Sequence, residues 1–564
     1  MRYRLLFLLL LSAGLLDFVF SQNFTDIPDS ARQKIEKALP AHPQAEPLRK
    51  HKILVFNLNI RDGQERKGHP SIPFANYAIE RMGETTGAYQ VVFSNDTLMF
   101  TPENLAQFDA ICFNNTVGVL VESEQLRNSL LDYIWQGGGF IGIHAAGATF
   151  VQYPVYDQFP PFGIMLGGYE NGGHPWKPED WITLKLDDPD HPVNSAFDKD
   201  GFYVSDEVFQ FREHYSRDKL RVLLSIDTTR TDMSMDRYIL PERRNDGDIA
   251  ISWVRQYGRG HVFYTSLGHN AHLNWNPPVL QHYLDGIQFA LGDLDAPITP
   301  SGKLIPAEKA REALHWQFAF SANTLKNQTL FDAINKTAEL GLVYLDAAGT
   351  QQVSDDIRKP FDQNLTDNDI RAVRNKLEDA GVQLYSWSVP KLPGDQKSCK
   401  AVYEFAHKMG IRVLISEAEQ KSLPMIEDLN LEYDIRLALG SGSPDSPYQD
   451  PKAALEIAKF PFIGVCGDVA QWVDAGIEPA DAVRIIGKKL FVLHVHDLNK
   501  DNKDVPWIQG RANLDAMFRS MAANVKTPVI IGLDYDQEGG PSTMQLKQCV
   551  SWFDHFCPRL EVVK

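Results

Sequence analysis

Four residues in the second half of the sequence have the types and placement needed to bind a divalent metal: Glu417, Asp468, His494 and Asp534. Each lies at the carboxyl end of a short apolar segment or within about two residues of it. Three carboxylates and an imidazole suit Mn²⁺, Mg²⁺, Co²⁺ or Zn²⁺, which can polarise a carbonyl group during proton transfer. A single acid at a strand end is commonly just solvated, so the shared placement of all four carries the prediction.

A second group of candidates, rich in histidine, lies in the first half. His144 occupies the centre of the motif at 142–147, which has the form of a nucleophile elbow, a sharp turn that exposes one side chain after a strand. His174, Glu207 and His269 follow near glycines and, with His144, could bind a metal or act as acid and base. The alternative is that His174 and His269 only hydrogen-bond nearby loops. Glutaminase activity is not expected, because imidazole lacks the thiol needed for the acyl step.

Parallel sheets are the elements that could bring such residues together. In the first half, short apolar segments alternate with helical patterns, which is typical of a parallel sheet with helices on its faces. These segments span 53–56, 91–93, 110–113 and 140–143. The segments 249–254 and 261–265 flank a glycine-containing turn and predict a hairpin joined to the sheet.

Beyond a stretch of prolines and small residues at 295–302, eight apolar segments recur, and helical patterns or long loops follow the first seven. They span 314–319, 342–346, 383–387, 412–416, 435–439, 462–466, 490–495 and 529–533. Eight such units in about 250 residues predict a (β/α)₈ TIM barrel, with an open doubly wound sheet as the alternative. In a barrel the chemistry lies just after the strands, as the four candidate ligands do.

The amino terminus predicts export. Arg2 and Arg4 precede an apolar run, 5–16, and the small residue Ser21 follows, which is typical of a cleaved signal peptide. An uncleaved membrane anchor is the alternative; after cleavage no membrane span is expected, and the protein would be periplasmic or secreted. The expected parts are a signal peptide (1–21), a lead (22–50), an α/β domain (51–292), a linker (293–312) and the barrel (313–558).

Composition excludes some partners. The formal net charge of -17 repels nucleic-acid phosphates, so no nucleic acid is expected to bind. The five cysteines contain no CxxC pair, which argues against a disulfide framework and a zinc–thiolate site. The sequence favours no particular oligomeric state.

The barrel motifs at 415–419, 464–468, 493–499 and 533–536 resemble the sugar phosphate isomerase/epimerase family of xylose-isomerase-like barrels. The resemblance implies that Glu417, Asp468, His494 and Asp534 hold a divalent metal, and that the ligand is a sugar. Asp346 falls where many relatives keep a glutamate.

The same region departs from that family. The sequence at 440–442 is Gly-Ser-Gly where close relatives have His-Asn-His, and Gln471 replaces a second histidine. Asp534 is one methylene shorter than the usual glutamate, which predicts weaker metal binding. The barrel could therefore be altered in catalysis or kept as a binding scaffold. His496, where relatives often have lysine, could restore a base; the alternative is a solvated loop histidine.

The first half, from His51 to Leu291, resembles the ThuA-like (trehalose-utilisation) family. The motifs that carry the resemblance lie at 142–147, 166–168, 173–175, 206–207, 253–264 and 267–269. The resemblance implies a class I glutamine-amidotransferase-like, flavodoxin-like sheet without the cysteine, and a link to oxidised sugars.

We therefore expect an exported protein that acts on sugars or keto-sugars by metal- or base-assisted proton transfer, as an isomerase, epimerase or lyase. A ketone acidifies the neighbouring C–H bond, so one base and one metal or hydrogen-bond donor suffice. The alternative is a non-catalytic carbohydrate-binding protein with a degenerate barrel.

Overall fold

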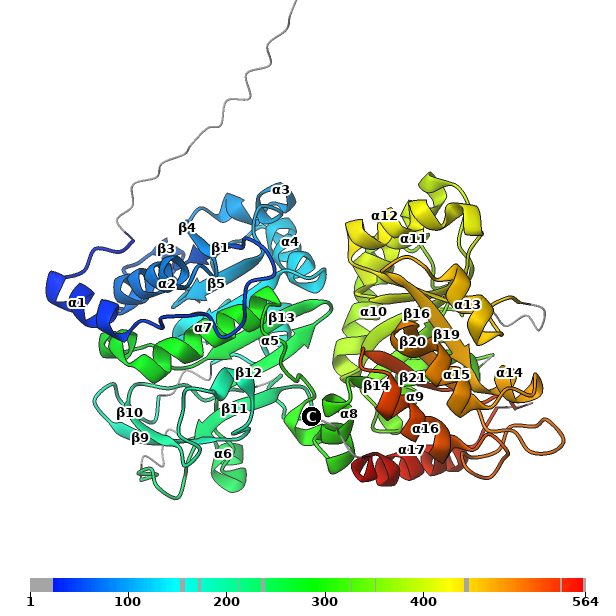
Figure 1. Cartoon of the computed structure of the whole chain (residues 1–564). Coiled ribbons are helices and arrows are strands. Elements are labelled where there is room, and N and C mark those ends of the chain that lie inside the picture. Colours follow the sequence, from blue (N-terminus) through cyan, green and yellow to red (C-terminus); the bar gives the residue numbers. More distant parts are fainter. Residues whose placement is uncertain are drawn as a thin grey trace, which may run out of the picture.

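The computed structural model shows two α/β domains side by side, an N-terminal sheet domain and a C-terminal barrel (Figure 1). It describes residues 24–560 except 153–157, 171–173, 213, 235–238, 326, 350, 441–445 and 538–539. The expected signal peptide and most of the Gly-Ser-Gly stretch at 440–442 lie outside the described residues. Within them, no helix has both the length and the apolar character needed to cross a membrane.

The N-terminal domain is built on a nine-stranded sheet in the order β10-β9-β11-β12-β13-β7-β5-β1-β4. Five neighbouring strands are parallel. They are β1 (Lys52–Phe56), β4 (Gln90–Phe93), β5 (Ala110–Asn114), β7 (Gly139–Ile143) and β13 (Gly260–Thr265). Numbered along the chain they lie in the order 2-1-3-4-5, which is the flavodoxin-like order. The predicted fold of this domain is confirmed.

The other half of the sheet is antiparallel. Strand β12 (Ala250–Tyr257) pairs with β13 as the predicted hairpin. Beyond it lie β11 (Arg221–Ile226), β9 (Trp181–Leu186) and β10 (Phe202–Ser205), which sequence patterns did not predict. Long irregular connections separate these strands, so their pairing depends on contacts distant in sequence.

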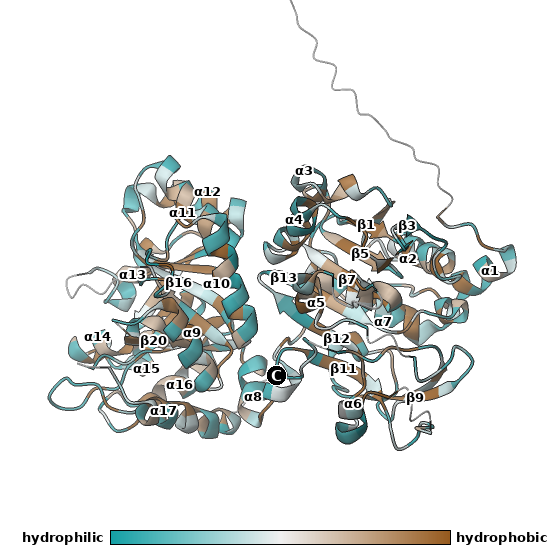
Figure 2. Cartoon of the chain, turned by 180° about the vertical axis from the view of Figure 1, so that it is seen from behind, coloured by the Kyte–Doolittle hydropathy of each residue, from teal (hydrophilic) through white to brown (hydrophobic). Residues whose placement is uncertain are grey.

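Helices cover both faces of this sheet, so its central strands are buried on both sides. Ile53 and Val55 pack towards one face, and Leu54 and Phe56 towards the other, as the two-residue period of a strand requires. The first face carries α1 (Asp29–Ala38), α2 (Ile72–Thr86) and α7 (Pro277–Leu291). The second face carries α3 (Pro102–Leu105), α4 (Glu124–Trp135) and α5 (Pro160–Leu166). Figure 2 shows apolar strands inside and hydrophilic helix surfaces outside.

The C-terminal domain is a closed barrel of eight parallel strands, so the barrel prediction is confirmed over the open sheet. The strands are β14 (Trp316–Ser321), β15 (Tyr344–Ala348), β16 (Gln383–Lys391), β17 (Val413–Glu417), β18 (Arg436–Leu439), β19 (Ile463–Asp468), β20 (Leu490–Val495) and β21 (Val529–Leu533). The larger helices are α9 (Leu330–Glu339), α10 (Asp367–Ala380), α11 (Gln396–Met409), α12 (Leu423–Tyr433), α13 (Pro451–Ile457), α14 (Val469–Asp474), α15 (Pro479–Ile486), α16 (Leu514–Asn524) and α17 (Thr543–Phe556). Helix α8 (Pro306–Ala313) falls in the segment expected as a linker and packs against α17 and β14.

The two domains meet at the amino-terminal ends of their parallel strands. Arg259, in the β12–β13 turn, donates hydrogen bonds to the carbonyl oxygens of Ile411 (3.0 Å) and Asp434 (2.8 Å). Both acceptors lie just before barrel strands, so this contact uses the amino-terminal end of the barrel. Arg255 pairs with Glu378 alongside. Catalytic residues of TIM barrels lie at the opposite, carboxyl-terminal face, so the barrel mouth faces away from the N-terminal domain.

Arg259 should be the main polar link between the domains. We predict that Arg259→Ala lowers the free energy of unfolding by about 2–4 kcal/mol, because two buried carbonyl groups lose a charged donor. Urea denaturation of the full chain measures the change. Asp434→Asn is the matched control: it removes only an exposed charge, tolerates the left-handed backbone at this position (φ 50°), and should cost less than about 1 kcal/mol. Equal losses in both variants would contradict the assignment to the carbonyl bonds.

Candidate functional site

A cavity of about 430 Å³ opens at the carboxyl ends of the parallel strands in the N-terminal domain. Its walls include Arg61 after β1, Val117 after β5 and Ala145 after β7. The strand order reverses between β1 and β5, and flavodoxin-like sheets bind ligands at that switch point. The candidate residues of the first half gather around this cavity.

His144 directly follows β7 in a left-handed backbone conformation, with φ 47°. That conformation strains a residue with a side chain, and it is how an elbow exposes one residue above a sheet. The ring is fully buried, and Nδ1 lies 2.7 Å from the carbonyl oxygen of Ser266. A carbonyl only accepts, so Nδ1 carries the proton and Nε2 keeps a lone pair. Nε2 is buried and has no hydrogen-bond partner among the described residues.

His269 is positioned by a buried carboxylate. Asp206 accepts hydrogen bonds from the backbone N–H groups of Gly268 (2.8 Å), His269 (3.3 Å) and Asn270 (2.8 Å). Burial raises the pKa of Asp206 to about 7, although these three donors favour the charged form. Asp206 therefore fixes the loop after β13 that carries His269.

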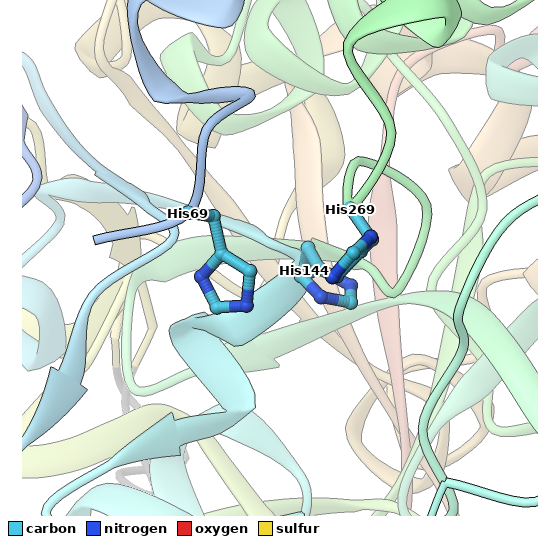
Figure 3. A group of neighbouring side chains, drawn as sticks. All are labelled: His69, His144 and His269. Carbon is cyan, nitrogen blue, oxygen red and sulfur yellow. The ribbon is translucent and has the colours of Figure 1, made fainter. Parts of the chain in front are cut away.

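A third histidine, His69, completes the group, and the sequence analysis missed it. In Figure 3 the rings of His69, His144 and His269 face one another; we call them the histidine triad. One ligand nitrogen from each lies within 4.8 Å of the others, and no other group of His, Cys, Asp or Glu among the described residues meets this criterion. The available signal was a repeated tripeptide, because Gly-His-Pro occurs at 68–70 and again at 173–175.

The spacing of the triad fits a single metal ion. The ring centres lie 5.1, 5.2 and 5.3 Å apart, and the ring planes are nearly perpendicular. With Zn–N bonds of about 2.0–2.1 Å, imidazoles at tetrahedral angles would have their centres about 5.2 Å apart. Three protein ligands leave a fourth position open, as in catalytic zinc sites.

The electrostatics of the triad also suit a metal. Burial, reinforced by His269, lowers the pKa of His69 to about 4. Burial likewise holds the pKa of His144 well below its usual value. Both rings are therefore neutral at pH 7 and present lone pairs, which is the ligand form of histidine.

Two acids lie beside the triad. Glu207 Oε1 is 3.9 Å from His269 Nε2 and 3.8 Å from His174 Nε2. Glu170, which is buried and was not predicted, places its Oε1 3.8 Å from the same nitrogen of His174. Glu170, His174 and Glu207 all line the cavity. The structure thus brings all four sequence-predicted residues of this domain together, His144, His174, Glu207 and His269.

The barrel candidates lie at the mouth of the barrel. Asp468 ends β19, His494 lies in β20, and His496 and Asp534 come directly after β20 and β21; all four line a cavity of about 650 Å³. Glu417 ends β17 on the same edge but is not part of that lining. His496 is buried rather than solvated, and burial, which opposes its charge, is outweighed by Asp534 and Asp504, which hold its pKa well above the usual value.

Residues 52–290 match the family model described as trehalose utilisation. An uncharacterized protein from Parabacteroides distasonis is 22% identical, with 42% of this chain and 98% of that one covered and a TM-score of 0.36. A ThuA-like protein from Bacteroides uniformis is 18% identical, with 43% of this chain and 93% of that one covered and a TM-score of 0.32. A D-tagatose 3-epimerase-like protein is 14% identical, with 42% of this chain and 96% of that one covered and a TM-score of 0.34. No curated protein matches the chain.

The triad predicts where metal binds. His69→Ala and His144→Ala should each weaken Zn²⁺ binding by at least about 100-fold, because changes in groups that only support a ligand already cost 10–100-fold. Titration of the purified full chain with Zn²⁺ against a chromophoric chelator measures the affinity.

His42→Ala is the control, since His42 is an exposed histidine of the same domain and should leave the affinity unchanged. Retention of wild-type affinity in both triad variants would rule out this site.

Proposed function

We propose that the N-terminal domain is a metal-dependent enzyme that acts by proton transfer on a carbohydrate bearing a carbonyl group. The observation that carries this proposal is the histidine triad at the edge of a cavity that His69, Glu170 and Glu207 line, with Glu207 Oε1 3.9 Å from His269 Nε2. The match to a family described as trehalose utilisation supports a sugar as the substrate. We also propose export, supported by the basic start and apolar run of residues 1–21.

The residues divide the chemistry between them. His69, His144 and His269 would hold the ion, and a divalent ion there would polarise the carbonyl group of the sugar and so acidify the neighbouring C–H bond. Glu207 is within 4 Å of a triad nitrogen and of His174, which places its carboxylate to take the proton from that carbon. His174 lies between Glu207 and Glu170. In this proposal it would return a proton to the substrate atom that gains one in the reaction.

The size and charge of the cavity suit such a substrate. About 430 Å³ falls in the range of small-molecule sites and accommodates a sugar of one or two rings. Glu122, Glu170 and Glu207 face a single arginine, Arg61, among the lining residues. This excess of acid favours an uncharged sugar over a sugar acid.

A non-catalytic, carbohydrate-binding role is the alternative to this proposal. It predicts that the wild-type protein catalyses no proton exchange on the sugar. The exchange rate of the wild-type protein therefore separates the two, and a substitution at Glu207 tests the base.

We predict that Glu207→Gln lowers kcat by about 10²–10⁴-fold while the metal content stays at the wild-type level, because the amide keeps the shape and loses the base. The measurement is NMR in D₂O, following exchange of the proton next to the carbonyl of a neutral keto-sugar. Glu179→Gln, at an exposed acid outside the cavity, is the matched control and should exchange at the wild-type rate. Wild-type exchange in Glu207→Gln would contradict Glu207 as the base, and exchange no faster than in buffer with the wild-type protein would favour the binding role.

A further inference from the structure

The mouth of the barrel contains five acidic and imidazole side chains that pair with one another, which we call the barrel chain. In order they are Asp346, His494, Asp534, His496 and Asp504. His494 Nε2 lies 2.9 Å from Asp346 Oδ2, and His496 Nδ1 lies 2.9 Å from Asp504 Oδ2. Asp534 Oδ2 lies between the two rings, 3.5 Å from His496 Nε2 and 4.0 Å from His494 Nδ1, which also lies 3.9 Å from Cys466 Sγ. Carboxylates and imidazoles thus alternate along the chain.

This pairing does not fit the metal that the resemblance to xylose-isomerase-like barrels implies. Asp534 Oδ1 already accepts from Thr324 Oγ1 (3.2 Å) and from the backbone N–H of Tyr535 (2.9 Å). Asp468 Oδ1 caps helix α14 by accepting from the Gln471 N–H at 3.0 Å. Two of the four expected ligands therefore have an oxygen in use elsewhere.

The expected ligands are also too far apart. Ligand atoms of one ion bound at about 2.0–2.2 Å cannot lie more than about 4.4 Å from each other. Within the described residues, only the histidine triad brings three such atoms within 4.8 Å, and Glu417 does not line the cavity. The barrel residues would have to move closer together to surround one ion.

The cavity has a distinct charge pattern. Asp468, Asp474 and Asp536 line it together with Asp504 and Asp534, whereas its lining, as far as the described residues show it, includes no lysine or arginine. Its volume, about 650 Å³, is ample for a sugar. Phosphate groups are normally bound by arginine, lysine or helix N-termini. Here a phosphorylated ligand would meet an excess of carboxylates over the two lining imidazoles, which already pair with carboxylates.

We propose that the barrel mouth is a metal-independent site for an uncharged polyhydroxy ligand, bound through the hydrogen bonds of the barrel chain. In the barrel chain each imidazole lies between two carboxylates, in the region where the resemblance to xylose-isomerase-like barrels implies a metal cation. The chain then holds one divalent ion in total, in the N-terminal domain. The count of one ion per chain rests on the proposed function of the N-terminal domain. The proposal that the barrel binds no metal does not rest on it.

Metal analysis of the full chain tests the proposal. Wild-type, His144→Ala and His494→Ala proteins are equilibrated with Zn²⁺, or separately with Mn²⁺, desalted and measured by mass spectrometry of the metal. We expect one ion per chain in wild type and in His494→Ala, and none in His144→Ala. Asp468→Asn, which keeps a helix-capping oxygen, is a second barrel variant and should also hold one ion.

The outcomes separate the two proposals. Two ions in wild type, with one lost in His494→Ala or Asp468→Asn, would overturn the metal-free barrel and leave the triad intact. One ion that survives in His144→Ala and disappears in the barrel variants would overturn both.

Calorimetry tests the ligand class, with D-fructose and D-fructose 6-phosphate as probes and the His144→Ala protein in EDTA as the sample. We expect D-fructose to bind at least about tenfold more tightly than its phosphate, with the binding lost in a His494→Ala, His144→Ala double variant. Tighter binding of the phosphate, or binding of neither probe, would overturn the assignment of the ligand.

Discussion

Three imidazole rings with centres 5.1–5.3 Å apart cannot all carry a proton, because each charge would lie close to two others in a buried site. The rest of the N-terminal domain depends on this constraint. The rings stay neutral and direct lone pairs at a common point, which a metal ion would satisfy. His144 Nε2 is the atom for which this matters most, because it is buried with no hydrogen-bond partner in the part of the chain that the structure describes, and an unpaired buried polar atom costs free energy.

The surrounding structure holds the triad in place at several levels. The flavodoxin-like strand order brings the segments after β1, β7 and β13 to one edge of the sheet. The left-handed backbone at His144 and the bond from its Nδ1 to Ser266 then fix that ring, and Asp206 fixes the loop of His269. Because the domains join through the amino-terminal end of the barrel, the barrel mouth lies on the far side. The two cavities therefore do not open onto the contact between the domains.

Sequence patterns predicted the parallel strands of the first domain and all eight barrel strands, since buried parallel strands are short apolar runs separated by helices. They also predicted that His494, His496 and Asp534 would lie at the barrel mouth. They could not predict how those side chains pair, because Asp504 comes from a loop and Asp346 from a strand far along the chain. His69 was missed for a similar reason: it lies in a loop after β3 (Gln64–Glu65), and only the folded sheet brings it to His144. Strands β9, β10 and β11 escaped prediction because local patterns do not show distant pairing.

The central claim is that the histidine triad binds the metal of this protein. X-ray absorption spectroscopy at the zinc edge, on the full chain loaded with one equivalent of Zn²⁺, tests it most directly. The account predicts a shell of four or five light atoms at about 2.0–2.1 Å, with the outer-shell scattering of three imidazole rings. A shell dominated by carboxylate oxygen with at most one imidazole, which is what Glu417, Asp468, His494 and Asp534 would give, would contradict it.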